Sequence, residues 1–296
     1  MGHSIRESDA TIVARDGYPL AATVIAPEAP PPGSPLVIFG SATAVPRAYY
    51  RTFAGLLAER GHPTIQFDYR GVAGSAPKPP LTLRNFPHRN RIWGTIDIPS
   101  VIDWARQTFP DRPVHWVGHS FGGFGFGLAD NNHLITRTLN VATPFSYWGQ
   151  MDGAEKYKIA LQAYVAMPAA ATLVGKLPGW TLGGADLPAA VSREWAQWLR
   201  TPDMFFSDAT LPETKNFANV RADMLFLRIT DDPWATDQGA QLWKDRFSRS
   251  RVTIERIRPE DANVKAIGHI PFFKPRFKDT LWPRALDWIT AEGNAR

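Results

Sequence analysis

Residues 114–123, VHWVGHSFGG, decide the fold because they lead from a strand into a helix through a serine between two glycines. Residues 114–117 form the apolar run of a buried strand, and a helix is expected from Ser120 onward. The spacing of Gly118, Ser120 and Gly122 matches the G-x-S-x-G nucleophile elbow, a sharp strand-to-helix turn that raises a serine above a sheet. Glycines keep this crowded turn free of side chains. We therefore predict a nucleophilic serine here, against the alternative that so short a pattern occurs by chance.

The helix after this serine contains four glycines, each of which costs roughly 1 kcal/mol of helix propensity relative to alanine. A local preference that is broken this often indicates a second requirement. We expect either close packing of the helix against neighbouring strands or open space for a substrate. The glycines are Gly122, Gly123, Gly125 and Gly127.

Strands and helices alternate along most of the chain. Residues 11–14 and 20–25 flank the turn DGYP and predict an N-terminal β-hairpin. The alternation indicates an α/β fold with a mainly parallel central sheet flanked by helices. Apolar runs predict further strands at 36–40, 63–67, 114–117, 138–142, 224–229 and 252–257, and helical spacing predicts helices at 47–61, 97–109, 236–247 and 282–289.

One region interrupts this alternation. Between residues 144 and 222 the sequence suggests helices and loops with no clear strand. We expect a helical cap inserted over the carboxyl edge of the sheet, with residues 1–143 and 223–296 forming the core. The apolar residues of the cap either shape a pocket for an apolar acyl or aromatic group of a substrate or form the cap's own core. The aromatic residues concerned are Trp148, Trp180, Trp195, Trp198, Phe205 and Phe206.

A nucleophilic serine at such an elbow needs an acid and a histidine base, which follow it in that order along the chain. Of the seven histidines, only His269 lies beyond the late strands, in the segment IGHIP. We predict that His269 is the base, the alternative being an exposed loop histidine without a catalytic role.

The acid is expected just after the strand at 224–229, where two aspartates are adjacent in TDDPWAT. Asp232, directly before Pro233, has the position expected of the carboxylate that orients the histidine. Asp231 is the alternative, and its other role would be a hydrogen bond to the loop. Asp237 is a third candidate, whose place near the next helix start favours exposure to solvent.

A site of this kind also needs N–H donors for a developing oxyanion. The backbone N–H of Phe121 follows the nucleophile, and the second donor is expected in the loop SATAVP at 41–46. The spacing back from Gly61 favours the Thr43 N–H, with Ala42 or Ala44 as alternatives.

The segments GHSFGG, FDYRGVAGS, DDPWAT and IGHIPFF together resemble serine hydrolases of the α/β-hydrolase superfamily, near its serine-aminopeptidase and monoacylglycerol-lipase-like branch. The resemblance covers almost the whole chain. It implies an α/β-hydrolase fold, a triad of Ser120, Asp232 and His269, and an oxyanion donor at Phe121. The family's common His-Gly pattern after the third strand is replaced here by FGSAT at 39–43, which leaves the second donor open.

The composition excludes several classes of protein. The chain has 296 residues, no cysteine and a net charge of +5, so disulfides, thiolate catalysis and cysteine-bound metals are excluded. Its basic residues are scattered, which argues against a nucleic-acid partner. No histidine and carboxylate cluster has convincing metal-ligand spacing. Without a signal peptide or an apolar run of membrane-spanning length, the chain is expected to be soluble and cytoplasmic. A mechanism based on a serine triad is expected to need no cofactor.

Together these residues predict a hydrolase that cleaves a carboxylic ester of a small molecule through an acyl-enzyme on Ser120. An aminopeptidase, amidase or acyl-thioesterase would use the same triad. A non-catalytic ligand-binding protein of this fold is the alternative from a different class. Assays with esters, thioesters and amides distinguish the enzymes, and labelling by a fluorophosphonate tests the non-catalytic alternative.

Overall fold

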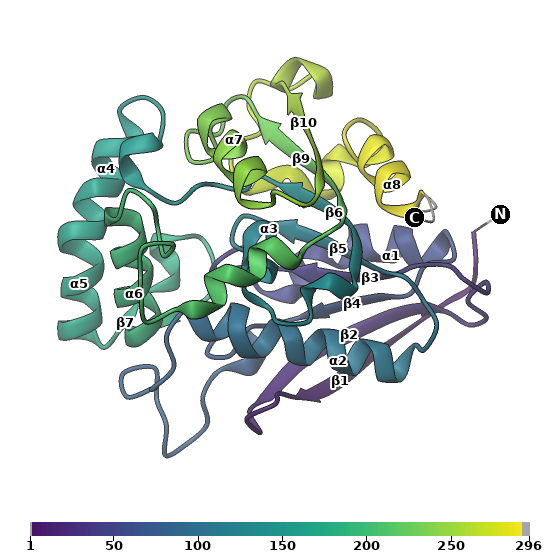
Figure 1. The fold of residues 1–296 in the computed structure, drawn as a ribbon, viewed down its shortest axis with the longest axis horizontal. Helices are drawn as coiled ribbons and strands as arrows, with labels where there is room; N and C mark the ends of the chain where they lie inside the picture. Colours follow the sequence, from purple (N-terminus) through teal and green to yellow (C-terminus); the bar gives the residue numbers. More distant parts are fainter. Residues whose placement is uncertain (1, 292–296) are drawn as a thin grey trace.

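The computed structural model describes residues 2–291, and an eight-stranded sheet runs through the middle of the molecule (Figure 1). Its strands are β1 (Ile5–Val13), β2 (Pro19–Pro27), β3 (Leu36–Gly40), β4 (Thr64–Phe67), β5 (Val114–His119), β6 (Ile135–Val141), β9 (Asp223–Ile229) and β10 (Arg251–Ile257). They lie in the order β1-β2-β4-β3-β5-β6-β9-β10. β1 and β2 form the expected hairpin, and β2 also pairs antiparallel with β4, whereas the remaining neighbours are parallel. The prediction of a mainly parallel sheet is confirmed.

Helices cover both faces of the sheet, because its central strands are apolar on both sides. In β3, Leu36 and Ile38 pack into one core and Val37 and Phe39 into the other, as the alternation of side chains along a strand requires. The first core contains residues of α2, α3 and α7, and the second contains residues of α1 and α8. These helices are α1 (Arg51–Glu59), α2 (Ile98–Thr108), α3 (Gly122–Gly125), α7 (Asp237–Arg246) and α8 (Trp282–Thr290).

The glycine-rich helix α3 is a single turn, which the 3-10 turn Phe126–Leu128 extends. A Cβ atom on Gly123 would lie 2.0 Å from Thr143 Oγ1, and one on Gly127 would lie 2.3 Å from the ring of Phe217. Both distances are far shorter than a van der Waals contact. The glycines therefore serve close packing, which is one of the two explanations that the sequence offered.

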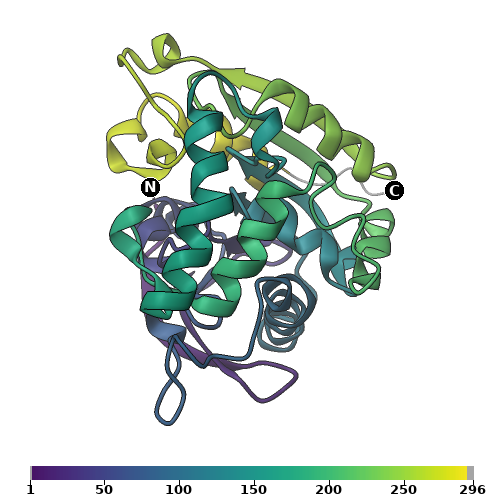
Figure 2. The ribbon, with the colours of Figure 1, turned by 90° about the vertical axis from the view of Figure 1, so that its left-hand side faces the viewer.

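Residues 144–222, which we call the inserted segment, lie between β6 and β9. Their main helices are α4 (Glu155–Leu161), α5 (Met167–Ala169) and α6 (Ala189–Arg200). The π-helical turns Gln162–Ala166 and Ala170–Val174 make α4 and α5 parts of one helical run, and α6 packs against that run (Figures 1 and 2). All of them lie at one end of the sheet, on the left in Figure 1 and facing the viewer in Figure 2.

The expectation that the inserted segment has no strand is wrong. β7 (Lys176–Leu177) and β8 (Leu187–Pro188) form a short antiparallel pair. Two residues are too few to show an alternating pattern, so the sequence carries no signal for them. The assignment of residues 144–222 as a separate cap stays a prediction.

The aromatic residues of the inserted segment differ in their surroundings. Trp198 is buried in the core, whereas Trp180 is 84% exposed. Large apolar side chains are also exposed along the helical run, and they are Tyr157, Leu161, Tyr164, Val165, Leu173 and Val174. Even so, no helix within residues 2–291 combines the length and the apolar character needed to cross a membrane.

Candidate active site

Ser120 occupies a strained turn between β5 and α3. Its backbone φ is +51°, a left-handed value that a residue with a side chain adopts at a cost. Hydrogen bonds hold the turn, since the Ser120 N–H donates to the Val141 carbonyl at 3.0 Å and the Gly122 N–H to the Ser41 carbonyl at 3.2 Å. A Cβ atom on Gly122 would lie 1.9 Å from the carbonyl oxygen of Gly40, which explains the glycine at this position.

The structure brings Ser120, His269 and Asp232 into one hydrogen-bonded row. Ser120 Oγ lies 2.9 Å from His269 Nε2, and His269 Nδ1 lies 2.7 Å from Asp232 Oδ2. Because a carboxylate only accepts, Nδ1 carries the proton and Nε2 is left to accept from the serine hydroxyl. Asp232 is 1% exposed, and its second oxygen accepts from the Trp234 N–H at 2.9 Å. Both oxygens are thus occupied, which fixes the carboxylate.

The adjacent carboxylate of Asp231 has a different position. It accepts hydrogen bonds from the backbone N–H groups of Ile267, at 2.8 Å, and of Gly268. Asp231 therefore ties down the loop that carries His269, and this is the role that the sequence left open for it. Asp237, the third candidate, forms an ion pair with Arg256 at 2.8 Å.

The two backbone N–H groups that the sequence favours as oxyanion donors have no hydrogen-bond acceptor among the described residues. Within residues 2–291, the N–H groups of Phe121 and Thr43 donate to no protein atom. The Ala42 N–H, an alternative to Thr43, is instead bonded to the Tyr50 hydroxyl at 2.9 Å. Thr43 lines both cavities that reach Ser120, and Phe121 lines one of them.

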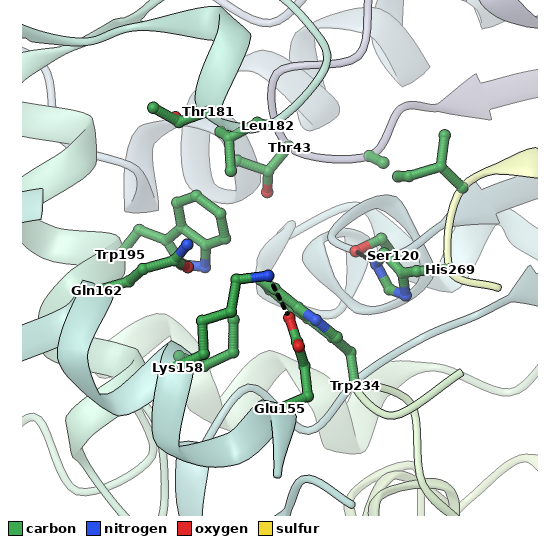
Figure 3. A pocket seen from close by; sticks show the side chains of 13 residues that line it. Thr43, Ser120, Glu155, Lys158, Gln162, Thr181, Leu182, Trp195, Trp234 and His269 are labelled. Carbon is green, nitrogen blue, oxygen red and sulfur yellow. Dashed lines mark hydrogen bonds and ion pairs between the residues drawn. The ribbon is translucent and has the colours of Figure 1, made fainter. Parts of the chain in front are cut away.

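The larger cavity beside Ser120 and His269 has a volume of about 210 Å³. Figure 3 shows Trp195 and Gln162 on its far side from Ser120 and His269. Glu155 and Lys158, both from α4, form an ion pair of 3.2 Å in its wall (Figure 3). The inserted segment thus supplies part of the cavity wall, and Ser120 with the loops that carry Thr43, Trp234 and His269 supplies the rest.

The smaller cavity, of about 10 Å³, lies between Ser120 and a group of aromatic rings. Trp195 and Trp234 line both cavities, and Trp195 is only 7% exposed. The aromatic residues that line the smaller one are Phe121, Phe124, Trp195, Trp198 and Trp234.

The alpha/beta hydrolase family matches residues 13–277, which is most of the chain. The protein belongs to the alpha/beta hydrolase family. Its membership makes it a hydrolase and agrees with the eight-stranded sheet described above. The finer branch, near serine aminopeptidases and monoacylglycerol lipases, stays a prediction. No curated protein matches this hydrolase in sequence.

Several solved structures share the fold of this hydrolase. An esterase of Pyrococcus furiosus has a TM-score of 0.60 at 14% identity, over 96% of this chain and 90% of the other. An esterase of Exiguobacterium antarcticum has a TM-score of 0.60 at 14% identity, over 98% of this chain and 100% of the other. Est1E of Butyrivibrio proteoclasticus, with ferulic acid bound, has a TM-score of 0.59 at 16% identity, over 95% of this chain and 96% of the other. At these identities the likeness establishes the fold alone.

Sequence reasoning missed one side chain that touches the histidine of this hydrolase. The ring of Trp234 stacks on the His269 ring, with centroids 5.5 Å apart and an interplanar angle of 29°. The available signal was its place two residues after Asp232 in TDDPWAT, on the loop that holds the carboxylate. Within residues 2–291, no group of three or more histidines and carboxylates is arranged to hold a metal ion.

Proposed function

We propose that this hydrolase cleaves a carboxylic ester through an acyl-enzyme on Ser120. The observation that carries the proposal is the unbroken row of hydrogen bonds, 2.9 Å and 2.7 Å long, from Ser120 through His269 to Asp232 beside a cavity. A serine with an adjacent base, and a base with an orienting carboxylate, is the arrangement that activates a hydroxyl for acyl transfer.

In the first half of the reaction, Ser120 Oγ bonds to the ester carbonyl carbon and passes its proton to His269 Nε2. Asp232 accepts the hydrogen bond from Nδ1 and stabilises the imidazolium. The free N–H groups of Phe121 and Thr43 supply donors for the carbonyl oxygen as it gains negative charge. The ester C–O bond then breaks, and the departing alkoxide takes the proton from Nε2.

In the second half, water adds to the acyl carbon and gives a proton to His269. The bond between the acyl carbon and Ser120 Oγ breaks, and that proton returns to the serine. The products are an alcohol and a carboxylic acid, and the enzyme is restored.

We infer that residues 144–222 act as a cap and that the substrate carries an apolar or aromatic group. Trp195 and Trp234 offer ring surface in both cavities that reach Ser120, which favours such a group. Glu155 places a carboxylate in the wall of the larger cavity, and its ion pair with Lys158 offsets its charge. An aminopeptidase needs a carboxylate that is free to bind the substrate's ammonium group, so the pairing of Glu155 favours an ester.

The test compares Ser120→Ala with Ser192→Ala in the hydrolysis of p-nitrophenyl acetate. Loss of the nucleophile should lower kcat by at least about 10³-fold without lowering the melting temperature. Ser192 is a fully buried serine of α6 whose hydroxyl has no partner within residues 2–291, so its alanine variant should keep the wild-type rate. Wild-type turnover by Ser120→Ala would refute the proposal.

A matched set of acetyl ester, acetyl thioester and aminoacyl amide then tests the choice of bond. We expect the ester to have the highest kcat/KM. A higher value for the amide or for the thioester would contradict an esterase while leaving the triad intact.

A further inference from the structure

Two buried polar residues next to the triad take no part in the chemistry above. Tyr50 ends the 3-10 turn Arg47–Tyr50, and His119 is the last residue of β5. The Tyr50 hydroxyl lies 2.9 Å from the Ala42 backbone nitrogen and 2.9 Å from His119 Nδ1. His119 Nε2 lies 3.0 Å from the backbone oxygen of His269. Tyr50 and His119 are 1% and 0% exposed, so water does not compete for these bonds.

The direction of every bond in this row follows from elementary chemistry. The His269 carbonyl can only accept, so His119 Nε2 carries a proton. Burial, with a smaller contribution from the nearby His269, lowers the pKa of His119 to about 3, so the imidazole is neutral and its Nδ1 is an acceptor. The Tyr50 hydroxyl therefore donates to Nδ1, and its oxygen accepts the hydrogen bond from the Ala42 N–H.

The row of hydrogen bonds joins the loop that carries Thr43 to the loop that carries His269. At one end, Ala42 directly precedes Thr43, the proposed second oxyanion donor. At the other end, the acceptor is the backbone carbonyl of His269, the proposed base. A parallel bond strengthens the connection, since the hydroxyl of Tyr49 donates to the Ile270 carbonyl at 2.8 Å.

We propose that Tyr50 and His119 are positioning residues that hold the oxyanion loop and the histidine loop in register with Ser120, an inference that rests on the proposed function. Acyl transfer needs the base, the nucleophile and the N–H donors in place together. Misplacement by about 1 Å can cost a factor of 10² in rate. A row of directed bonds between two loops is a means of keeping that register.

The test uses Tyr50→Phe, with Tyr69→Phe as the matched control. Tyr50→Phe keeps the ring but leaves the Ala42 N–H and His119 Nδ1 without a partner. We expect kcat for p-nitrophenyl acetate, per active site titrated with a fluorophosphonate, to fall by about 10- to 100-fold with little change in KM. Tyr69 is a buried tyrosine whose hydroxyl has no partner within residues 2–291, so Tyr69→Phe should keep the wild-type kcat.

A second pair of variants separates positioning from packing. Gln at position 119 has a carbonyl oxygen for the Tyr50 hydroxyl and an amide N–H for the His269 carbonyl, whereas Leu has neither. His119→Gln should therefore retain most of kcat, and His119→Leu should lose as much as Tyr50→Phe. If His119→Leu does not fold, Tyr50→Phe alone decides the matter.

The outcomes separate this inference from the proposed function. An inactive wild type, or an active Ser120→Ala, overturns the proposed function on which the inference rests. An active wild type with Tyr50→Phe at the wild-type kcat overturns the positioning role, even if that variant has a lower melting temperature. A fall in kcat for Tyr50→Phe but not for Tyr69→Phe supports it.

Discussion

Asp231 and Asp232 are neighbours in the chain, yet they hold different parts of the site. Asp232→Asn should lower kcat by about 10³- to 10⁴-fold, because an amide in place of the carboxylate no longer fixes the His269 tautomer or stabilises the imidazolium. Asp231→Asn should instead lower the free energy of unfolding by about 1–3 kcal/mol, since it weakens the bonds to the Ile267 and Gly268 N–H groups. Steady-state kinetics and denaturant unfolding measure the two effects.

Each of these variants is the control for the other, because the substitution is the same and the positions are adjacent. A larger loss of kcat in Asp231→Asn than in Asp232→Asn would reverse the assignment. The sequence favoured Asp232 without excluding Asp231, since the turn of a loop decides which of two adjacent side chains meets the histidine. The structure makes that distinction, because Asp231 accepts from the Ile267 N–H whereas Asp232 accepts from His269 Nδ1.

At the scale of single elements, packing outweighs helix propensity in α3 and in the 3-10 turn Phe126–Leu128 that follows it. Alanine is the better helix former, but a Cβ on Gly127 would lie 2.3 Å from the Phe217 ring. Gly127→Ala should therefore lower the free energy of unfolding by about 1–3 kcal/mol.

Gly55 in α1 offers the matched control, because nothing lies within 4 Å of a Cβ built there. Gly55→Ala should raise the free energy of unfolding by about 0.5–1 kcal/mol. Denaturant melts of both variants are decisive, and a stabilised Gly127→Ala would contradict the packing argument.

The elements themselves were largely predictable from sequence. β3 was predicted with its observed bounds, and α8 within one residue, because their apolar patterns are local and strong. The prediction failed at β7 and β8, whose pairing depends on the fold of the inserted segment and not on their own two residues.

At the scale of the whole molecule, a buried histidine makes stability depend on pH. His115 lies in β5 with Nδ1 2.6 Å from the Ile289 carbonyl in α8. Burial, with smaller contributions from Arg137 and His62, lowers the pKa of His115 from its ordinary 6.5 to about 4. Between these values the unfolded chain takes up a proton that the folded chain does not, so stability falls as the pH falls.

We expect proton uptake by His115 in the unfolded chain to lower the free energy of unfolding by about 3 kcal/mol on going from pH 7 to pH 4. His115→Gln, which stays neutral and can still donate to Ile289, should reduce the pH dependence by that amount. His133→Gln, at an exposed position, is the control. Urea unfolding at both pH values measures the effect, and the same pH dependence in His115→Gln and wild type would contradict it.

The long-range contacts of the site could not be predicted from sequence. Tyr50 and His119 are 69 positions apart, and no local pattern links a tyrosine in a 3-10 turn to a histidine at the end of a strand. The order of Ser120, Asp232 and His269 was visible because the motif and the strand sequence constrain it. Which backbone N–H groups stay free depends on how all the loops meet, and only the folded chain reveals that.

The two cavities beside Ser120 differ greatly in the space that they offer to a small molecule. The smaller one, at about 10 Å³, holds at most about one water molecule. During the proposed cycle, a departing alcohol and the water that replaces it would therefore share the larger cavity, of about 210 Å³. An alcohol at high concentration in that cavity would compete with water for the acyl group on Ser120. Transfer of the acyl group to the alcohol would then form a new ester in place of the acid.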